Sequence, residues 1–194
     1  MGSSLLGIIY QNRKDLLSAV QNLLNQGHDP SYVTSHNESP LRVASNNGRF
    51  DVVKLLLSKG VDESQLGWTA LFHTIAYGDI EDVEEAITDG SDLEVRDYWS
   101  RTPFLLSILA GDIRKTEILV QAGANTKVVG RCGRAPMTYA IQKDNVAMLG
   151  WLIERGFDIE QVNDFGDTPL MEAAENGALE CLRTLIKKGA DISK

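Results

Sequence analysis

The chain has 194 residues, of which 43% are hydrophobic, and it carries a formal net charge of −8 with a pI near 4.9. This acidic balance argues against a general DNA- or RNA-binding protein, which needs a basic surface to displace counterions from phosphates. No apolar run approaches the roughly 18 residues of a membrane span, and the first residues lack the basic start of a signal peptide. We therefore expect a cytoplasmic protein that binds neither nucleic acid nor membrane and is a monomer when free. Its acidic surface favours a basic protein partner.

A repeat of 33 residues runs through nearly the whole chain. Glycines recur at steps of 33, 30, 33, 33 and 33 residues, at Gly27, Gly60, Gly90, Gly123, Gly156 and Gly189. A second landmark keeps the same step, at Ser39-Pro40, Thr69-Ala70, Thr102-Pro103, Ala135-Pro136 and Thr168-Pro169. Two landmarks with one period predict a stacked solenoid, an architecture that usually serves as a binding surface.

The last repeat shows most clearly what each position is expected to do. Thr168 is placed to cap a helix with its hydroxyl, and Pro169 follows where a missing N–H costs nothing. Gly177 can adopt the left-handed conformation that ends this first helix. The apolar residues expected on its buried face are Leu170, Ala173 and Ala174. A second helix is expected to bury a stripe formed by Leu182, Leu185 and Ile186.

These residues resemble the ankyrin repeat, whose pattern is approximately D-x-x-G-x-T-P-L-H-x-A-A followed by L-L-L-x-x-G-A-D. The other matches are the stretches that begin at Gln65, Asp97 and Gly130. The resemblance implies an all-α repeat solenoid of helix–turn–helix units joined by β-turn or hairpin loops. It implies a single domain over residues 1–194, with repeats at 5–33, 34–63, 64–96, 97–129, 130–162 and 163–194. The first repeat lacks the Thr-Pro start, and the short step between Gly60 and Gly90 predicts a clipped turn at residues 61–66.

No group of residues in the sequence has the spacing of a catalytic or metal site. The histidines at 28, 36 and 73 form no H-x-x-x-H motif, and Cys132 and Cys181 form no C-x-x-C motif. The glycines around Cys132 lack the Gly-Lys-Ser/Thr ending of a phosphate-binding loop and are explained by turn geometry. We expect no enzyme activity, no metal and no cofactor.

The family resemblance places the binding surface on the turn tips and on the exposed side of each first helix, along one concave face. The residues expected to contact a partner are Trp68, Tyr77, Tyr98, Trp99, Arg101, Arg131, Arg134, Phe165 and Asp167. Other positions of the same face are Arg42, Asn46, Asn47, His73, Leu109, Gln142, Lys143, Glu172 and Glu175. Aromatic rings flanked by arginine and aspartate have the composition of interaction hot spots. Alternatively, Trp68 and Trp99 fold back over the turn or the neighbouring repeat, whereas Trp151 is expected in the core.

Acidic residues crowd between Asp62 and Asp97, where Arg96 is the one lysine or arginine. Many of them fall on the expected second helix of that repeat. Such a charge run is most often a solvated helix face. The alternative is a patch that steers a basic partner toward the protein.

These features predict a protein-binding module whose binding is itself the activity. The narrower hypothesis is an inhibitor or immunity-type protein that occludes a basic toxin or enzyme, by analogy with small acidic repeat proteins. The alternative is a scaffold, adaptor or effector that regulates a signalling or host protein. A third hypothesis is a self-assembling unit, since an uncapped solenoid end can stack on another.

Overall fold

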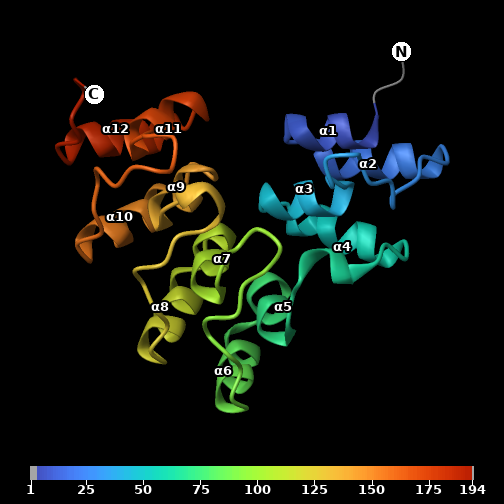
Figure 1. Ribbon diagram of the computed structural model, residues 1–194, viewed down its shortest axis with the longest axis horizontal. Coiled ribbons are helices and arrows are strands. Elements are labelled where there is room, and N and C mark those ends of the chain that lie inside the picture. Colours follow the sequence, from blue (N-terminus) through green and yellow to red (C-terminus); the bar gives the residue numbers. More distant parts are fainter. Residues whose placement is uncertain (1–3, 194) are drawn as a thin grey trace. The chain divides into compact units, whose positions relative to one another are not determined.

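The computed structural model describes residues 4–193, and this part of the chain is helical throughout, with no β-strand. It contains twelve α-helices and two short 3₁₀-helices. The chain divides into two compact parts, Met1–Trp68 and Thr69–Lys194 (Figure 1). The predicted all-α repeat architecture is therefore confirmed, while the single-domain organisation stays a prediction.

The N-terminal part consists of two helix pairs and a 3₁₀-helix. Its elements are α1 (Leu5–Gln11), α2 (Leu16–Asn25), α3 (Pro40–Asn46), α4 (Phe50–Ser58) and η1 (Glu63–Leu66). The two helices of each pair pack together, and α1 and α2 pack in turn on α3 and α4. The fully buried aliphatic side chains between them include Ile9, Leu16, Val20, Leu41 and Leu56. The clipped turn predicted at 61–66 is the stretch that forms η1, which ends at Gly67 in the left-handed conformation.

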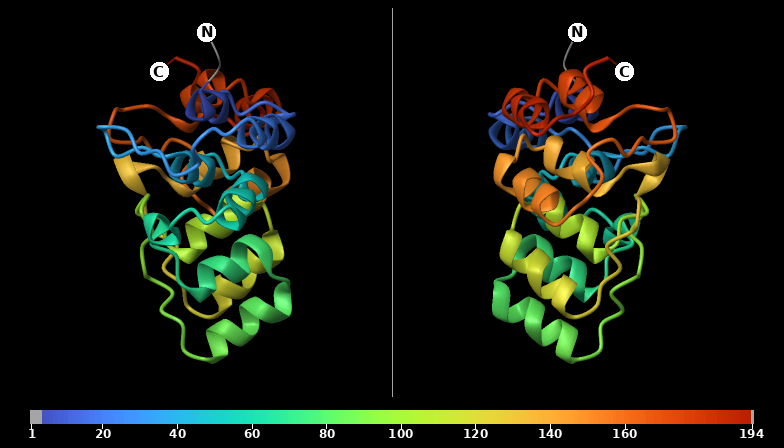
Figure 2. Two further views of the ribbon diagram at one scale, coloured as in Figure 1. Left: turned by 90° about the vertical axis from the view of Figure 1, so that its right-hand side faces the viewer. Right: turned by 90° about the vertical axis from the view of Figure 1, so that its left-hand side faces the viewer.

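The C-terminal part consists of four helix pairs in sequence. Its elements are α5 (Ala70–Tyr77), α6 (Ile80–Thr88), α7 (Pro103–Ala110), α8 (Ile113–Gln121), η2 (Arg131–Gly133), α9 (Pro136–Ile141), α10 (Val146–Glu154), α11 (Pro169–Glu175) and α12 (Leu179–Lys187). The first helices pack in one row, α5 on α7 on α9 on α11. Among the second helices, α6 packs on α8 and α10 on α12. Both rows can be followed within this part in Figures 1 and 2.

The predicted helix boundaries follow from capping chemistry. Thr102 and Thr168 accept hydrogen bonds through their hydroxyls from the N–H groups of Leu105 and Met171, and a proline follows each threonine at the first helical position. Gly177 has a φ of 65° directly after the C-cap of α11, which is the left-handed conformation predicted for it. These local signals fix where α7 and α11 begin, whereas Thr69 and Ala135 make no side-chain cap at the starts of α5 and α9.

The core of the last repeat differs from the predicted apolar stripes. Ala173 and Leu185 are fully buried as expected, and Leu170 and Leu182 are half-buried. Ala174 is exposed and Ile186 is 48% exposed, so the prediction that they lie in the core was wrong. The buried position beside Leu185 is taken by Cys181 instead.

A buried lysine joins two successive repeats of the C-terminal part. Lys115 on α8 is only 6% exposed, and its ammonium donates to the carbonyls of Thr74 (3.1 Å), Ile75 (3.1 Å) and Gly78 (2.7 Å) at the end of α5. The last carbonyls of a helix lack partners within that helix and carry partial negative charge. The three acceptors therefore compensate the cost of burying the ammonium, and they tie α8 to the preceding helix pair.

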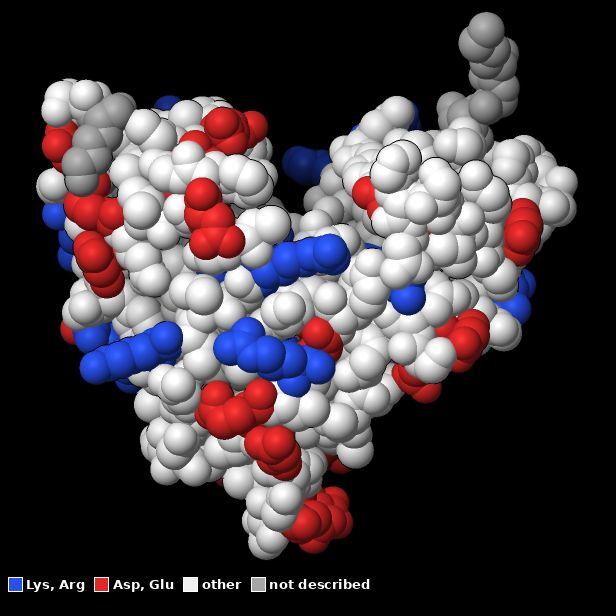
Figure 3. Space-filling view, viewed as in Figure 1, with Lys and Arg blue, Asp and Glu red and all other residues white. Residues whose placement is uncertain are grey.

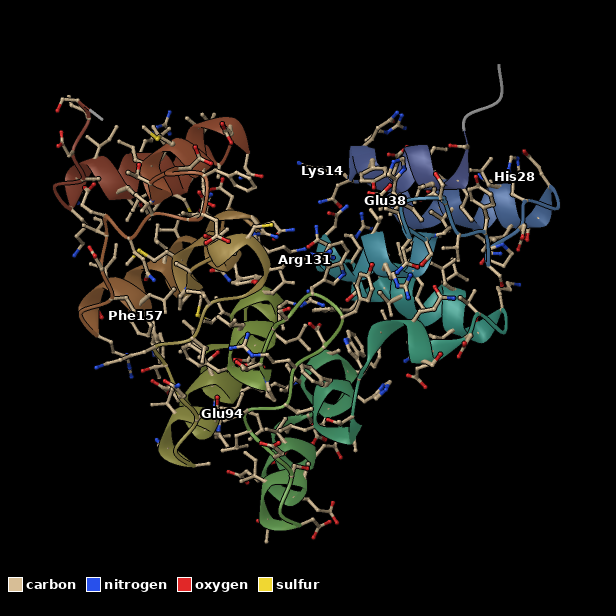
Figure 4. The ribbon with its side chains drawn as sticks, in the orientation of Figure 1. Lys14, His28, Glu38, Glu94, Arg131 and Phe157 are labelled. Carbon is tan, nitrogen blue, oxygen red and sulfur yellow. The ribbon has the colours of Figure 1, made fainter. Side chains whose placement is uncertain are left out.

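Glutamates in the connecting loops add a second link that recurs along the chain. Glu94 accepts a hydrogen bond from the N–H of Asn125 at 2.7 Å, and Glu160 accepts one from the N–H of Asp191 at 2.7 Å. The residues in both pairs are 31 positions apart. Figure 4 labels Glu94 on the loop that precedes α7. The recurrence shows that the loops as well as the helices keep the repeat register.

Leu185→Ala should lower the free energy of unfolding by about 2–5 kcal/mol, because it opens a cavity in a closed part of the core. Ile186→Ala is the matched control on the next residue, and its exposed side chain should cost less than about 1 kcal/mol. Urea denaturation of both variants measures the difference. Equal losses in the two variants would contradict the burial described for α12.

Lys115→Met should also destabilise the protein, by about 1–3 kcal/mol, because methionine keeps the length of the side chain but leaves the α5 carbonyls without their donor. Lys187→Met removes the same charge from an exposed position on α12 and should change stability by less than about 0.5 kcal/mol. Thermal unfolding of both variants tests this pair. A Lys115→Met variant as stable as the wild type would show that the buried ammonium contributes nothing net.

Candidate functional site

The turn tips that precede α7 and α11 are built by one shared hydrogen-bond pattern. The Oδ1 atom of Asp97 accepts the N–H groups of Trp99 and Arg101, each at 2.9 Å. The Oδ1 atom of Asn163 accepts the N–H groups of Phe165 at 2.9 Å and Asp167 at 3.0 Å. A short polar side chain that binds its own backbone in this way closes a tight turn. Each turn thereby holds an aromatic residue at its tip.

Backbone hydrogen bonds join the tips of three successive repeats. The N–H of Arg131 donates to the carbonyl of Trp99 at 3.1 Å, and the N–H of Asp164 donates to the carbonyl of Cys132 at 3.1 Å. The tips before α7, α9 and α11 are therefore a continuous structure within the C-terminal part. We call the side chains of Tyr98, Trp99, Arg131 and Phe165 on these tips the tip row.

Two aromatic rings and one arginine form the centre of the tip row. The rings of Tyr98 and Trp99 meet edge to face, with their centroids 5.2 Å apart. The guanidinium carbon of Arg131 lies 5.4 Å from the centroid of Trp99 and 5.7 Å from that of Tyr98. Cation–π attraction at these distances holds the exposed arginine against both rings. Figure 4 labels Arg131 on the connection between α8 and α9.

Phe165 is the most exposed large apolar side chain of the tip row. It is 75% exposed, although its backbone N–H is held by Asn163. A single exposed phenylalanine is ordinary on a protein surface. Here it lies one repeat from Arg131 and two repeats from Tyr98 and Trp99, so the tip row carries aromatic side chains on the tips before α7 and α11.

The prediction that Arg101 contacts a partner was wrong, because its side chain is fully buried. Its Nε and Nη2 atoms donate to Oδ2 of Asp97, at 2.8 and 2.5 Å, and the aspartate is itself only 6% exposed. Removing one member of a buried ion pair leaves the other charge uncompensated. Arg101 therefore supports the turn that carries Tyr98 and Trp99 and does not itself reach the surface.

Two other predicted aromatics are half-buried and touch aromatic neighbours of their own part of the chain. Trp68 belongs to the N-terminal part, where its ring meets Phe50 edge to face with centroids 6.0 Å apart. For Trp68 this arrangement matches the alternative in which the ring folds back over the scaffold. Tyr77, at the end of α5, lies with its ring centroid 6.1 Å from that of His73.

Arg134 and Asp167 are half-buried and take part in the turns. Arg134 donates to Oε1 of Gln142 at 2.7 Å, and its guanidinium carbon lies 5.1 Å from the ring centroid of Tyr139. Asp167 accepts a hydrogen bond from Nδ2 of Asn163 at 3.1 Å. Their role as direct partner contacts stays a prediction.

Three further predicted positions, Leu109, Glu172 and Trp151, are all buried. Leu109 is fully buried and Glu172 is 7% exposed, so neither lies on the exposed surface where the sequence analysis placed it. Trp151 is in the core as predicted, at 7% exposed, and its indole N–H donates to Oε1 of Glu117 at 3.0 Å.

Gly130 occupies the repeat position that Asp97 and Asn163 hold in their own turns. A Cβ atom at Gly130 would lie 1.9 Å from the hydroxyl oxygen of Tyr139, so no side chain fits there. The fully buried Tyr139 fills the space instead. Sequence analysis missed the supporting role of these three positions, although their spacing of 33 residues was the signal that could have found it.

Glu172 is a buried acid beneath the tips. Its carboxylate accepts hydrogen bonds from Oγ1 of Thr138 at 2.6 Å and from Nδ2 of Asn163 at 3.1 Å. Burial raises the pKa of this carboxyl group above its usual value, and the two hydrogen bonds and the charge of Arg134 oppose that rise. The acid joins the α9 repeat to the turn that carries Phe165.

The family follows from comparison with known proteins. A family model described as "Ankyrin repeats (3 copies)" matches residues 6–97 and 104–194. The chain belongs to the ankyrin-repeat family. Ankyrin repeats serve as protein–protein interaction modules, so membership makes binding to another protein the activity to explain.

One similar protein is the "Transient receptor potential cation channel subfamily A member 1 homolog" of Caenorhabditis elegans. It is 31% identical over 106 residues, which cover 54% of this chain and 9% of that protein. The chain thus matches a small part of a much longer protein.

Residues 4–193 contain neither a metal-binding cluster nor a membrane-spanning helix. This range holds no cluster of three or more His, Cys, Asp or Glu side chains arranged to bind a metal ion. None of its helices has both the length and the apolar character needed to span a bilayer.

Glu172→Gln should change how stability depends on pH. Because the folded pKa of Glu172 lies above the unfolded one, its carboxyl group favours folding below the unfolded pKa, and this advantage is lost as pH rises through the folded pKa. Glutamine cannot ionise, so its stability relative to wild type should increase between about pH 4 and about pH 7. Urea denaturation at both pH values measures this. Glu175→Gln, an exposed substitution on the same helix, is the control, and a relative stability of Glu172→Gln that falls with pH would contradict the assignment.

Proposed function

We propose that this protein is a non-catalytic protein-binding module that contacts its partner through the tip row and the exposed parts of its first helices. The observation that carries the proposal is the aromatic and arginine surface of the tip row, in which Arg131 and Phe165 are exposed and Tyr98 and Trp99 are half-buried, built on turns of an ankyrin scaffold. Tryptophan, tyrosine and arginine are the residues most enriched at interface hot spots.

The turns favour this role because they present the side chains in a preformed geometry. Asp97 and Asn163 hold the tips, and backbone hydrogen bonds join one tip to the next. A preorganised surface loses little conformational entropy when it binds, so more of the contact energy appears as affinity.

Occlusion of the partner's surface is the mechanism that we put first, and an inhibitor or immunity-type role is its narrower form. The net charge of −8 and the exposed carboxylates on and around α6 support a partner with a basic region. These carboxylates are Asp79, Glu81, Asp82, Glu84, Glu85 and Asp89, and acidic side chains dominate around α6 in Figure 3.

The second candidate function is a scaffold or adaptor. The similarity to a stretch of a long cation channel protein favours it, because that relative carries the similar repeats within a larger chain. A scaffold would bind several partners weakly, whereas an inhibitor would bind one partner tightly and with fixed stoichiometry.

We further propose that the protein is a monomer when free and acts in the cytoplasm. Both cysteines are free thiols, with Cys132 exposed and Cys181 buried. Unpaired cysteines fit a reducing compartment, and size measurements over a range of concentrations test the monomer.

Trp99→Ala should weaken partner binding by about 2 kcal/mol or more, as truncation of a hot-spot residue does. The fold should change little, because the turn is held by Asp97 and by backbone hydrogen bonds that the variant retains. The measurement is affinity capture from native lysate, followed by titration of the captured protein against wild type and variant.

Two controls accompany this experiment. Leu179→Ala removes a side chain that is 59% exposed on α12, away from the tips, and should leave capture unchanged. Trp68→Ala tests the tryptophan that packs on Phe50. A single stoichiometric partner that Trp99→Ala loses supports the inhibitor role. Capture that is indifferent to Trp99 would refute the tip row as the contact surface.

A further inference from the structure

The tips before α7 and α9 are opposite in charge to the whole chain, whereas the tip before α11 carries Asp164 and Asp167. Residues 96–101 and 130–134, which form the tips before α7 and α9, contain four arginines and one aspartate. The aspartate, Asp97, is buried against Arg101 and contributes little negative charge to the surface. The arginines that remain are Arg96, Arg131 and Arg134. Figure 3 shows Lys and Arg side chains over the α7–α10 region, in contrast to the acidic surface around α6.

Two of these three guanidinium groups are already engaged within the protein. Arg96 donates through Nη1 to the carbonyls of Ser100 at 2.6 Å and Val129 at 2.9 Å. Arg134 donates to Gln142. Arg131 is exposed, and within residues 4–193 its guanidinium touches only the rings of Tyr98 and Trp99, with no carboxylate in ion-pair distance.

Stacking on two rings prepares Arg131 to bind a carboxylate. The rings cover part of the guanidinium and restrict its movement, while cation–π attraction leaves its N–H groups available. A guanidinium held in one orientation can donate two parallel hydrogen bonds to a carboxylate, which is the strongest common form of charge-assisted pairing. Because its rotamers are already restricted, binding costs less conformational entropy than it would for a mobile arginine.

We infer, resting on the proposed function, that the tip row binds an acidic protein segment. One Asp or Glu carboxylate of the partner pairs with Arg131, and an apolar or aromatic side chain of the same segment packs on Phe165. This partner chemistry differs from the basic partner expected from the net charge, because the contact is set by local charge at the tips.

The spacing of the tips predicts the spacing of the two partner residues. Packed helices lie about 8–10 Å apart, and the tips of neighbouring repeats follow that separation. An extended peptide advances about 3.3 Å per residue. The acidic and apolar residues of the bound segment should therefore be about three positions apart.

The test is selection of a library of random linear peptides displayed on phage against the full chain. Enriched peptides should contain an Asp or Glu about three residues from an aromatic or aliphatic residue. In solution at about 50 mM salt, the best synthetic peptide should bind Arg131→Gln at least about tenfold more weakly than wild type. Raising the salt concentration should weaken binding to wild type, because the contact is exposed.

Arg114→Gln is the matched control, because it removes the same charge from an exposed position in the first turn of α8. Helix α7 separates this position from the tip before it, so Arg114→Gln should bind the peptide within about twofold of wild type. A second arm leaves the protein intact and replaces the peptide's acidic residue by its amide, which should cause a loss as large as that of Arg131→Gln. Because the protein is unchanged in this comparison, it tests the carboxylate contact even where a protein variant folds poorly.

Three results would overturn the inference. Enriched peptides that are neutral or basic, or that bind Arg131→Gln as tightly as wild type, exclude the carboxylate contact. If such peptides still lose binding in Trp99→Ala, the proposed protein-binding function stands and only the partner chemistry is wrong. If no peptide is enriched, the acidic segment is excluded, and the proposed function also fails where capture from lysate shows no partner that depends on Trp99.

Discussion

Stacking of helix pairs is the constraint on which the other features of this protein depend. A pair of helices of six to ten residues cannot bury its own apolar face, and each pair completes its core only against the next. Ile186 shows the effect within one repeat, since it is half exposed where the neighbouring Leu185 is closed off. The 33-residue period follows from this constraint, because every helix pair must present its apolar face to the next pair in the same register.

Polar contacts refine the stacking where apolar packing cannot. Lys115 binds the last carbonyls of the preceding repeat, and Glu94 and Glu160 hold loop N–H groups 31 residues further on. Asp97 has two roles at the tips, because it closes the turn and also compensates the charge of Arg101. Asp97, Asn163 and the hydrogen bonds between neighbouring tips hold the backbone of the tip row, which carries the exposed side chains of Arg131 and Phe165.

The sequence predicted the architecture well because the architecture depends on local, periodic signals. Thr168, Pro169 and Gly177 cap a helix through their own chemistry, and the period of the glycines gave the stack. The errors at Arg101, Leu109 and Glu172 have a common physical origin. Position in the repeat shows which residues lie near the tips or on the first helix, but the exposure of a side chain there depends on its partners. Asp97 draws Arg101 inward and Thr138 holds Glu172, and neither contact has a periodic signal.

The proposed function requires that a protein partner contacts the tips before α7, α9 and α11. Hydrogen–deuterium exchange of the free protein and of its complex with the captured partner tests this most directly. The account predicts slower exchange in residues 97–101, 130–134 and 163–167 on binding, with little change in α6 and α12. Protection confined to the acidic helix α6, or to the exposed side of α12, would contradict it.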